Sequence, residues 1–466
     1  MSADPAEQDA HMGIVRIANA SGFWGDDPEA PLRVVQQTPG LDYLTLDYLA
    51  EVSMSILAKQ RERNPSLGYA GDFVRAVGSL APLWKGGRKF RVVSNGGGLN
   101  APACAAACAE AMKSAGCTGL RLAVVTGDDV LPKIRERLVG GESGFSHLET
   151  GASIATIADR LTTASAYLGA AAVVEALRAG ADIVITGRLA DPSLTVAPAA
   201  AHFGWALDDY SRIAGATVAG HLIECGAQVT GGISTDWLDI PDKAHIGFPI
   251  VEIADDGSCV VTKPANTGGR VTERAVKEQL LYEIGDPAKY LSPDATVSFL
   301  NLRVDDLGHD RVRVSGAQGS SPPPTYKVSA TYGAGYRAAG MLTLFGRDVI
   351  HKAQACGEVV LKKMEESGHS PQRWLVECLG TGAVVGHAVN TRPEDLLETV
   401  LRISLGDQRR EVVEYFTRQL MPLVTAGPQG VTGYAEGRPA VHEVFGYWPT
   451  LIGRAAIATQ VEFLEV

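Results

Sequence analysis

Three reactive side chains lie close together in one apolar stretch, AGHLIECGAQVTGG, at residues 219–232. His221, Glu224 and Cys225 occupy positions i, i+3 and i+4, so a helix over this stretch would present all three on one face. An imidazole titrates near neutral pH, and a neighbouring carboxylate can orient it or tune its proton affinity. The spacing predicts a general acid/base site in which His221 moves the proton, Glu224 tunes it and Cys225 is a thiolate beside the imidazolium.

Two other interpretations of the same residues stay open. His221 and Glu224 can form a buried hydrogen-bonded pair at a domain interface, with Cys225 filling space. An H-x-x-E spacing can also supply two metal ligands, but the sequence shows no second His/Glu pair that would complete a metal site. We therefore expect no bound metal, and we keep a metal-dependent hydrolase or aldolase as a third candidate function.

Polar residues and glycines gather after each apolar segment that has the character of a buried strand. Ligands bind beyond the carboxyl ends of the strands in an open parallel sheet. The segment NGGGLN is the clearest case, because glycines let a ligand approach the backbone and the following helix presents unpaired N–H groups. A tight structural turn is the alternative. The predicted anion-binding residues of this segment are Asn95, Gly96, Gly97, Gly98 and Asn100.

Charged residues at other strand ends extend this prediction. Arg188 in TGRLADPS can clamp a carboxylate or phosphate, or it can pair with Asp191, which we also expect to cap the next helix. Lys327, after the proline run in PPPTYK, and Arg438, in EGRP, are further predicted contacts of an anionic ligand. The candidates for a second acid/base group are Asp26, Asp47 and Glu51.

The elements that must position these residues alternate in type over the first half of the chain. Apolar strand-like segments are separated by helical ones, and the strand-like segments are GIVRIANAS, DYLTLDYLAE, KFRVVSN, LRLAVVT and ADIVITGR. This alternation predicts an α/β fold with a doubly wound, mostly parallel sheet and helices on both faces, over residues 13–240. Short strands and helices near 347–366, 394–405 and 408–420 predict a C-terminal α+β domain, 241–466, that closes the cleft.

Composition limits the partners and the compartment. The net charge of −11 and the pI near 5.5 argue against nucleic acid or an anionic membrane as the main partner. No apolar run is long enough to cross a bilayer, and the polar start is unlike a signal peptide, so residues 1–12 are expected to be a leader or disordered. Seven scattered cysteines suit a reducing compartment, and we expect a cytoplasmic protein.

The motifs described above, together with SGFWGD at 21–26 and EGRPAVHEVFGYWP at 436–449, resemble those of the acyclic terpene utilisation (AtuA-like) family along the length of the chain. The resemblance implies catabolism of geraniol- and citronellol-type compounds through branched acyl-CoA thioesters. Many members are followed by a small ferredoxin-like module. This chain looks like the short form, so a separate small subunit is an expected partner. The resemblance supplies no catalytic residues.

Together these patterns predict an enzyme of acyl-CoA or branched carboxylic acid metabolism. The expected step is a lyase, hydratase or isomerase reaction without a redox cofactor, because no nicotinamide or flavin fingerprint is present. Coenzyme A would enter only as part of a small anionic substrate. The competing hypothesis is a non-catalytic scaffold or regulatory subunit of a catabolic complex, for example with an acyl-CoA carboxylase. A homo-oligomer is expected in either case.

Overall fold

The structure is a computed structural model that describes residues 13–141, 144–386, 396–433 and 437–466. The chain forms two compact units, one comprising residues up to Thr331 together with Tyr447–Val466, the other Tyr332–Gly446. Strands β14 (Thr325–Phe345) and β18 (His442–Gly453) carry the chain from one unit to the other. The expected boundary near residue 240 differs from this division. The expected leader, residues 1–12, lies outside the described residues.

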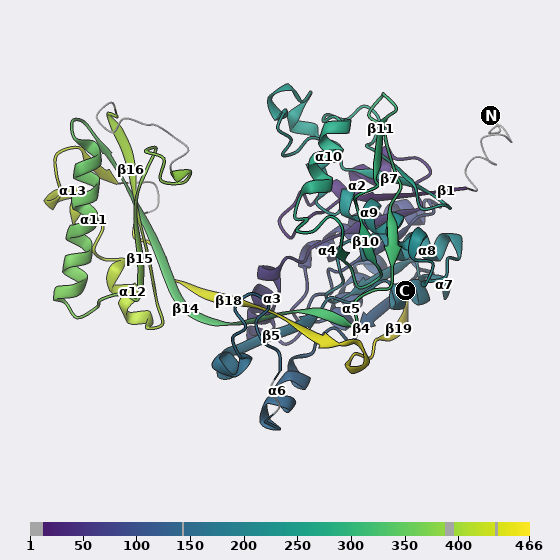
Figure 1. Cartoon of the computed structure of the whole chain (residues 1–466), viewed down its shortest axis with the longest axis horizontal. Coiled ribbons are helices and arrows are strands. Elements are labelled where there is room, and N and C mark those ends of the chain that lie inside the picture. Colours follow the sequence, from purple (N-terminus) through teal and green to yellow (C-terminus); the bar gives the residue numbers. More distant parts are fainter. Residues whose placement is uncertain (1–12, 142–143, 387–395, 434–436) are drawn as a thin grey trace. The chain divides into compact units, whose positions relative to one another are not determined.

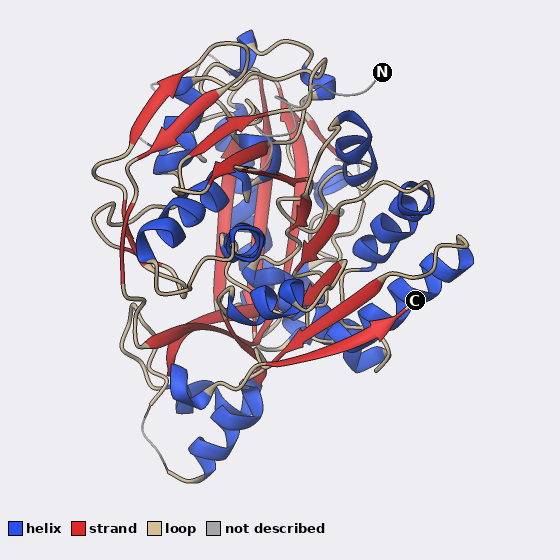
Figure 2. Ribbon diagram, turned by 90° about the vertical axis from the view of Figure 1, so that its right-hand side faces the viewer, coloured by secondary structure: helices blue, strands red, loops and turns tan. Residues whose placement is uncertain are grey.

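The centre of the first unit is a parallel sheet built from the apolar segments identified in the sequence. Its strands in spatial order are β1 (Ile14–Asn19), β2 (Tyr43–Leu46), β3 (Arg91–Ser94), β6 (Ile183–Thr186) and β4 (Arg121–Thr126). Most residues of these strands are buried on both faces, which explains why the segments are apolar without alternation. Figure 2 shows helices on both sides of the strands.

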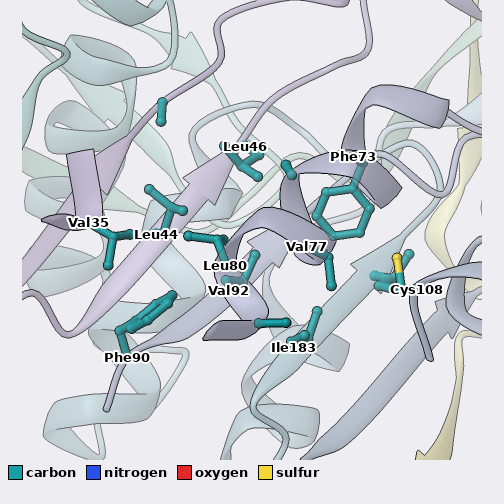
Figure 3. Packing of buried hydrophobic residues seen from close by; sticks show 14 of the residues in the cluster. Val35, Leu44, Leu46, Phe73, Val77, Leu80, Phe90, Val92, Cys108 and Ile183 are labelled. Atoms are coloured by element: carbon teal, nitrogen blue, oxygen red, sulfur yellow. The ribbon is translucent and has the colours of Figure 1, made fainter. Parts of the chain in front are cut away.

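Helices cover the two faces of this sheet in two sets. One set packs on the face that carries Leu44, Val92 and Ile183, where Phe73 and Leu80 of α4 meet them (Figure 3). The opposite face, to which Tyr43 points, meets His202 of α8. The helices of the first unit are α2 (Ala30–Gln37), α3 (Glu51–Arg63), α4 (Gly71–Lys85), α5 (Ala101–Ser114), α6 (Leu131–Val139), α7 (Ala171–Arg178), α8 (Ser193–Phe203), α9 (Tyr210–Ile223) and α10 (Glu273–Leu281). The predicted α/β class with a doubly wound parallel centre is confirmed.

Antiparallel strands extend the sheet at both edges. Beyond β1 they are β7 (Ile250–Ala254), β8 (Cys259–Thr262), β12 (Val312–Ser315) and β11 (Arg303–Asp306), and beyond β4 the strand is β19 (Gln460–Glu465). The chain after residue 240 therefore completes the first unit's sheet instead of starting a new domain. A small sheet holds β13 (Gln318–Ser320), β10 (Thr296–Ser298) and β9 (Tyr290–Leu291), and β5 (Leu161–Ala166) pairs with β14.

The second unit is an antiparallel sheet with helices on one face. Its strands are β15 (Arg373–Leu379), β16 (Glu398–Asp407), β14, β17 (Val431–Gly433) and β18, and its helices are α11 (Val349–Glu366), α12 (Arg410–Phe416) and α13 (Leu423–Ala426) (Figure 1). The helix expected at 394–405 is wrong, because ETVLRISLGD alternates buried and half-buried residues as strand β16. No helix in the described part of the chain combines the length and apolar character needed to cross a bilayer.

Candidate functional site

A cavity of about 390 Å³ lies wholly within the first unit. The ionisable side chains that line it come from several separate elements. The strand-end loop after β6 contributes Arg188 and Asp191, the end of α9 contributes His221 and Glu224, and β14 contributes Lys327. These five residues were singled out in the sequence, and the fold brings them together. The volume falls in the range typical of small-molecule sites.

Helix α9 places His221 and Glu224 at the cavity. The helix begins after Asp209, whose side chain accepts a hydrogen bond from the backbone N–H of Arg212, and it is buried from Ile213 to Ile223. His221 stands in its last turn, and Glu224 is the residue that ends it. The Nδ1 atom of His221 lies 2.9 Å from Oε1 of Glu224. The predicted i, i+3 contact is therefore present.

The second ring nitrogen of His221 is also occupied. Its Nε2 lies 2.9 Å from the main-chain carbonyl oxygen of Gln279 in α10. A carbonyl oxygen only accepts, so Nε2 carries a hydrogen and donates it. One further proton is then shared between Nδ1 of His221 and Oε1 of Glu224. The pair is either a neutral imidazole with a glutamic acid or an imidazolium with a carboxylate.

Burial and nearby charge set the proton affinity of this pair. Burial is the largest influence on Glu224 and raises its pKa to about 7, although the charge and hydrogen bond of His221 oppose this rise. Burial alone would lower the pKa of His221, but the charge and hydrogen bond of Glu224 outweigh it and the pKa is raised. The other carboxylate oxygen of Glu224, Oε2, is buried and has no hydrogen-bond partner among the described residues. Glu224 lines the cavity, and its Oε2 is the carboxylate oxygen that is left without a partner.

Arg188 is a buried cation in the lining of the cavity, with only 2% of its surface exposed. Its Nη1 lies 3.1 Å from Oδ1 of Asp191 and donates to the carbonyl oxygen of Leu49, and its guanidinium lies 4.1 Å from the ring centre of Tyr167. The pairing of Arg188 with Asp191, the alternative left open by the sequence, is therefore present. Asp191 does not cap the next helix, because Pro192 precedes α8 and no side chain caps it.

Lys327 supplies an exposed cation at the cavity, and the proline run before it is held in place. The Lys327 Nζ atom lies 4.8 Å from the ring centre of Tyr167 and 5.9 Å from that of Tyr447. Nε of Arg454 donates to the carbonyl oxygen of Pro323 at 2.7 Å, and its Nη1 lies 3.2 Å from the Tyr326 hydroxyl. The segment PPPTYK therefore forms part of the cavity wall, as the sequence suggested.

The NGGGLN loop is packed against the protein rather than lining this cavity. A Cβ on Gly97 would lie 2.6 Å from both the Thr186 carbonyl oxygen and the Ala101 Cβ, and Gly98, at φ +53°, sits against Leu57. Gly96 is similarly close to Phe73. The loop leads directly into helix α5. Asn100 caps α5, Asn95 donates from Nδ2 to Asp47, and these contacts account for the polar residues of the loop.

Asp26, Asp47 and Cys225 do not line the cavity. Asp26 accepts hydrogen bonds from the backbone N–H groups of Gly22 and Asp27 within its own loop. Asp47 is buried, and burial, followed by the charge of Asp191, raises its pKa well above the usual range. The thiolate expected at Cys225 is corrected, because burial raises its pKa to about 12. Arg438 is exposed on the second unit, and the side chain of Glu51 lies outside the described residues.

Among the cavity residues that were not identified from the sequence are Glu283, Tyr290 and Tyr167. Glu283 is exposed and adopts a left-handed backbone conformation at φ +61°, Tyr290 is on the short strand β9, and Tyr167 follows β5. Burial and the charge of Glu224 raise the pKa of Tyr290 well above its usual range. Glu283 and Tyr290 come from LYEIGDPAKYLS, which has neither helical nor strand periodicity, so no sequence pattern marked them.

Within the described residues, no group of three or more His, Cys, Asp or Glu side chains is arranged to hold a metal ion. Comparison with known proteins gives one finding about the chain as a whole. A family model described as "Acyclic terpene utilisation family protein AtuA" matches residues 15–463. No curated protein and no solved structure matches the chain. The family assignment implies a role in acyclic terpene catabolism and names no catalytic step. Because the match covers both units almost from end to end, the chain belongs to the acyclic terpene utilisation family.

Proposed function

We propose that the protein is an enzyme of acyclic terpene catabolism that carries out acid/base chemistry on a branched carboxylic acid or its acyl-CoA thioester. The reaction class would be a lyase, hydratase or isomerase step. The observation that carries the proposal is the state of Glu224. One carboxylate oxygen is held by His221, the other has no hydrogen-bond partner among the described residues, and the pKa lies near neutral pH.

In this proposal Glu224 is the acid/base group and His221 is a positioning residue. This exchanges the roles that the sequence suggested, because both nitrogens of His221 are engaged while Oε2 of Glu224 is not. A general base is most effective when its pKa is close to the working pH. The Glu224 carboxylate would take a proton from a substrate carbon next to the carbonyl. The electron pair would stay on the substrate as an enolate, which then expels a leaving group or is protonated at another carbon.

The charges around the cavity favour a substrate with one anionic end. Lys327 is exposed at the cavity, whereas Arg188 is almost fully buried. Lys327 is therefore the better candidate for binding a substrate carboxylate or phosphate. Three exposed leucines, Leu148, Leu291 and Leu451, also line the cavity and would contact an apolar chain.

Proton transfer of this kind needs no redox cofactor, and coenzyme A would act as the carrier of the substrate. The cavity is large enough for the acyl end of such a thioester. A separate small ferredoxin-like subunit, self-association and a cytoplasmic location stay predictions.

Exchange of substrate hydrogen for deuterium tests the proposed step, because an isomerase reaction and the elimination direction of a lyase or hydratase reaction begin with loss of a proton from carbon. The full chain would be incubated in D₂O with branched acyl-CoA thioesters, the free branched acids and small polycarboxylates, and deuterium uptake followed by mass spectrometry. We expect uptake with at least one compound and at least a ~100-fold loss in Glu224→Gln. Glu175→Gln, at an exposed position of α7 outside the cavity, is the matched control and should keep the wild-type rate.

Two results would contradict the proposal. Equal exchange by wild type and Glu224→Gln would remove Glu224 from the chemistry. Saturable binding of a thioester with neither exchange nor turnover would instead support the competing role, a regulatory or scaffold subunit that senses the metabolite.

A further inference from the structure

The sheet of the second unit has one face on which no helix of the described residues packs. Leu401, Ile403 and Leu405 of β16 pack into the core with α11 and α12. Side chains alternate along a strand, so the residues between them, including Ser404 and Gly406, point to the opposite face. In Figure 1, α11 runs alongside these strands. The described helices of this unit that contribute to its core, α11, α12 and α13, meet the sheet through the Leu401 face.

Two arginines flank a glycine on the uncovered face. Arg337 of β14 and Arg373 of β15 are both paired in register with Gly406 of the strand between them. All three residues therefore point to the same side of the sheet. Adjacent strands are about 4.8 Å apart, which places the two arginine Cα atoms roughly 10 Å apart. Because Gly406 has no side chain, the space between the two guanidinium stems is open.

A groove of about 550 Å³ lies over this row, and its charge is of one sign. Arg337, Arg373 and His442 are among its lining residues, and Ala339 and Ser404 lie in the next row of the sheet. No acidic side chain of the described residues lines the groove. This is a concentrated positive patch on a chain whose net charge is −11.

Neither arginine has a counter-ion in the described part of the chain. No hydrogen bond or ion pair joins the side chain of Arg337 or of Arg373 to another described residue. Arg402, on the same face two rows away, shows the contrasting arrangement. Its Nε and Nη2 atoms bind the two carboxylate oxygens of Glu377 at 2.7 and 2.8 Å. The sheet therefore neutralises one arginine fully and leaves two side by side without partners.

We propose that this arginine groove binds the phosphate group of a small phosphorylated molecule. A guanidinium presents two parallel N–H donors that match a phosphate, and two guanidiniums can bind a dianion from both sides. The bound phosphate would also relieve the repulsion between the two cations. The groove volume is that of a small-molecule site. The inference rests on the second unit alone and does not depend on the proposed function.

Calorimetric titration of the full chain at low salt tests this inference. The probes are inorganic phosphate, phenyl phosphate as a phosphate monoester, and succinate as a dicarboxylate. We expect saturable binding of phenyl phosphate, with a Kd about ten-fold higher in Arg337→Gln and in Arg373→Gln, since each variant loses a charged hydrogen-bond donor. The double variant should bind more weakly than either single variant.

Two control variants make the result specific. Arg418→Gln removes an equally exposed arginine that follows α12 and does not line the groove, and it should bind like wild type. Lys327→Gln removes the cation proposed to bind anions at the cavity of the first unit, so an unchanged Kd for phenyl phosphate in this variant separates the groove from that cavity. Absence of saturable binding by wild type, or equal binding by the Arg337/Arg373 double variant, would overturn the inference. Binding of succinate alone would overturn the assignment to phosphate.

Discussion

His221 and Gln279 bind each other twice, once through each side chain. Nε2 of the imidazole lies 2.9 Å from the Gln279 carbonyl oxygen, and Nε2 of the Gln279 side chain donates to the His221 carbonyl oxygen at 3.1 Å. Helices α9 and α10 thereby fix the imidazole from the side opposite Glu224. Within this pair, the proton that can change position is therefore the one between Nδ1 of His221 and Oε1 of Glu224. In the proposed mechanism the glutamate, and not the histidine, would therefore exchange the proton with substrate.

Catalysis should depend on pH through this pair. If the Glu224 carboxylate is the base, the exchange rate rises with pH through an inflection near 7. His221 lowers the pKa of Glu224 through its charge and hydrogen bond, so His221→Gln should move the inflection to higher pH. The measurement is the exchange rate against pH for both proteins. A variant that loses activity equally at every pH, without moving the inflection, would contradict a positioning role for His221.

Stability should fall with rising pH because of another buried acid, Asp128. Burial raises its pKa to about 7, although the backbone N–H of Arg188 donates to it at 2.8 Å and opposes the rise. The unfolded chain loses this proton near pH 3.8 and the folded chain only near 7, so the folded state binds more protons between these values and loses stability as pH rises.

Asp128→Asn removes this titration. Urea unfolding midpoints at pH 5 and pH 8 should therefore differ less in the variant than in wild type. Asp239→Asn, in an exposed turn, should retain the wild-type difference. An unchanged pH dependence in Asp128→Asn would show that Asp128 is ionised in the folded protein throughout this range.

Two glycine substitutions test whether the NGGGLN loop is a packing element. Gly97→Ala should cost about 1–3 kcal/mol, because the new Cβ would lie 2.6 Å from a backbone oxygen and from Ala101. Gly78→Ala, inside α4, places its Cβ at an ordinary 3.7 Å from Ala111 and should stabilise the protein by up to about 1 kcal/mol through helix propensity. Denaturant unfolding measures both. Equal stability of Gly97→Ala and wild type would refute the packing role.

Arg188 should be essential for stability. Arg188→Met removes the ion pair with Asp191 and the hydrogen bond to the Leu49 carbonyl oxygen, and we expect a loss of about 1–3 kcal/mol. The double variant Arg188→Met/Asp191→Asn should lose less than Arg188→Met, because it also removes the carboxylate that Arg188 neutralises. Unfolding free energies of the three proteins distinguish these outcomes. If the double variant is the least stable, the Arg188–Asp191 pair is not the cause.

The sequence predicted those features that follow from local periodicity. Apolar segments such as the one containing Val92 and Val93 indicated buried parallel strands, and the spacing of His221 and Glu224 indicated their contact. The same spacing also predicted that Cys225 would share the helical face of His221 and Glu224. That prediction was wrong, because α9 ends at Ile223 and Gly226, at φ +59°, turns the chain. Helix termini are decided by such backbone details, which spacing alone does not reveal.

The features of the site and of the groove that the sequence did not predict depend on contacts between distant segments. Gln279 fixes the tautomer of His221 from a helix 58 residues away, and Glu283 enters the cavity through a left-handed backbone conformation. Neither has a periodic signal. The two arginines of the groove become neighbours only through the register of β14, β15 and β16 with Gly406. The pattern of β16 was available in the sequence, since Leu401, Ile403 and Leu405 alternate with less buried residues.

The protonation state of Glu224 can be measured without any substrate. The full chain, labelled with ¹³C at the glutamate side-chain carboxyl carbon, would be titrated by NMR between pH 4 and 9, and Glu224→Gln would identify the resonance. We predict an apparent pKa for this carboxyl near 7. A Glu224 that is fully ionised at pH 5.5 would contradict the proposed role. A carboxylate with such a low pKa would not exchange a proton near neutral pH.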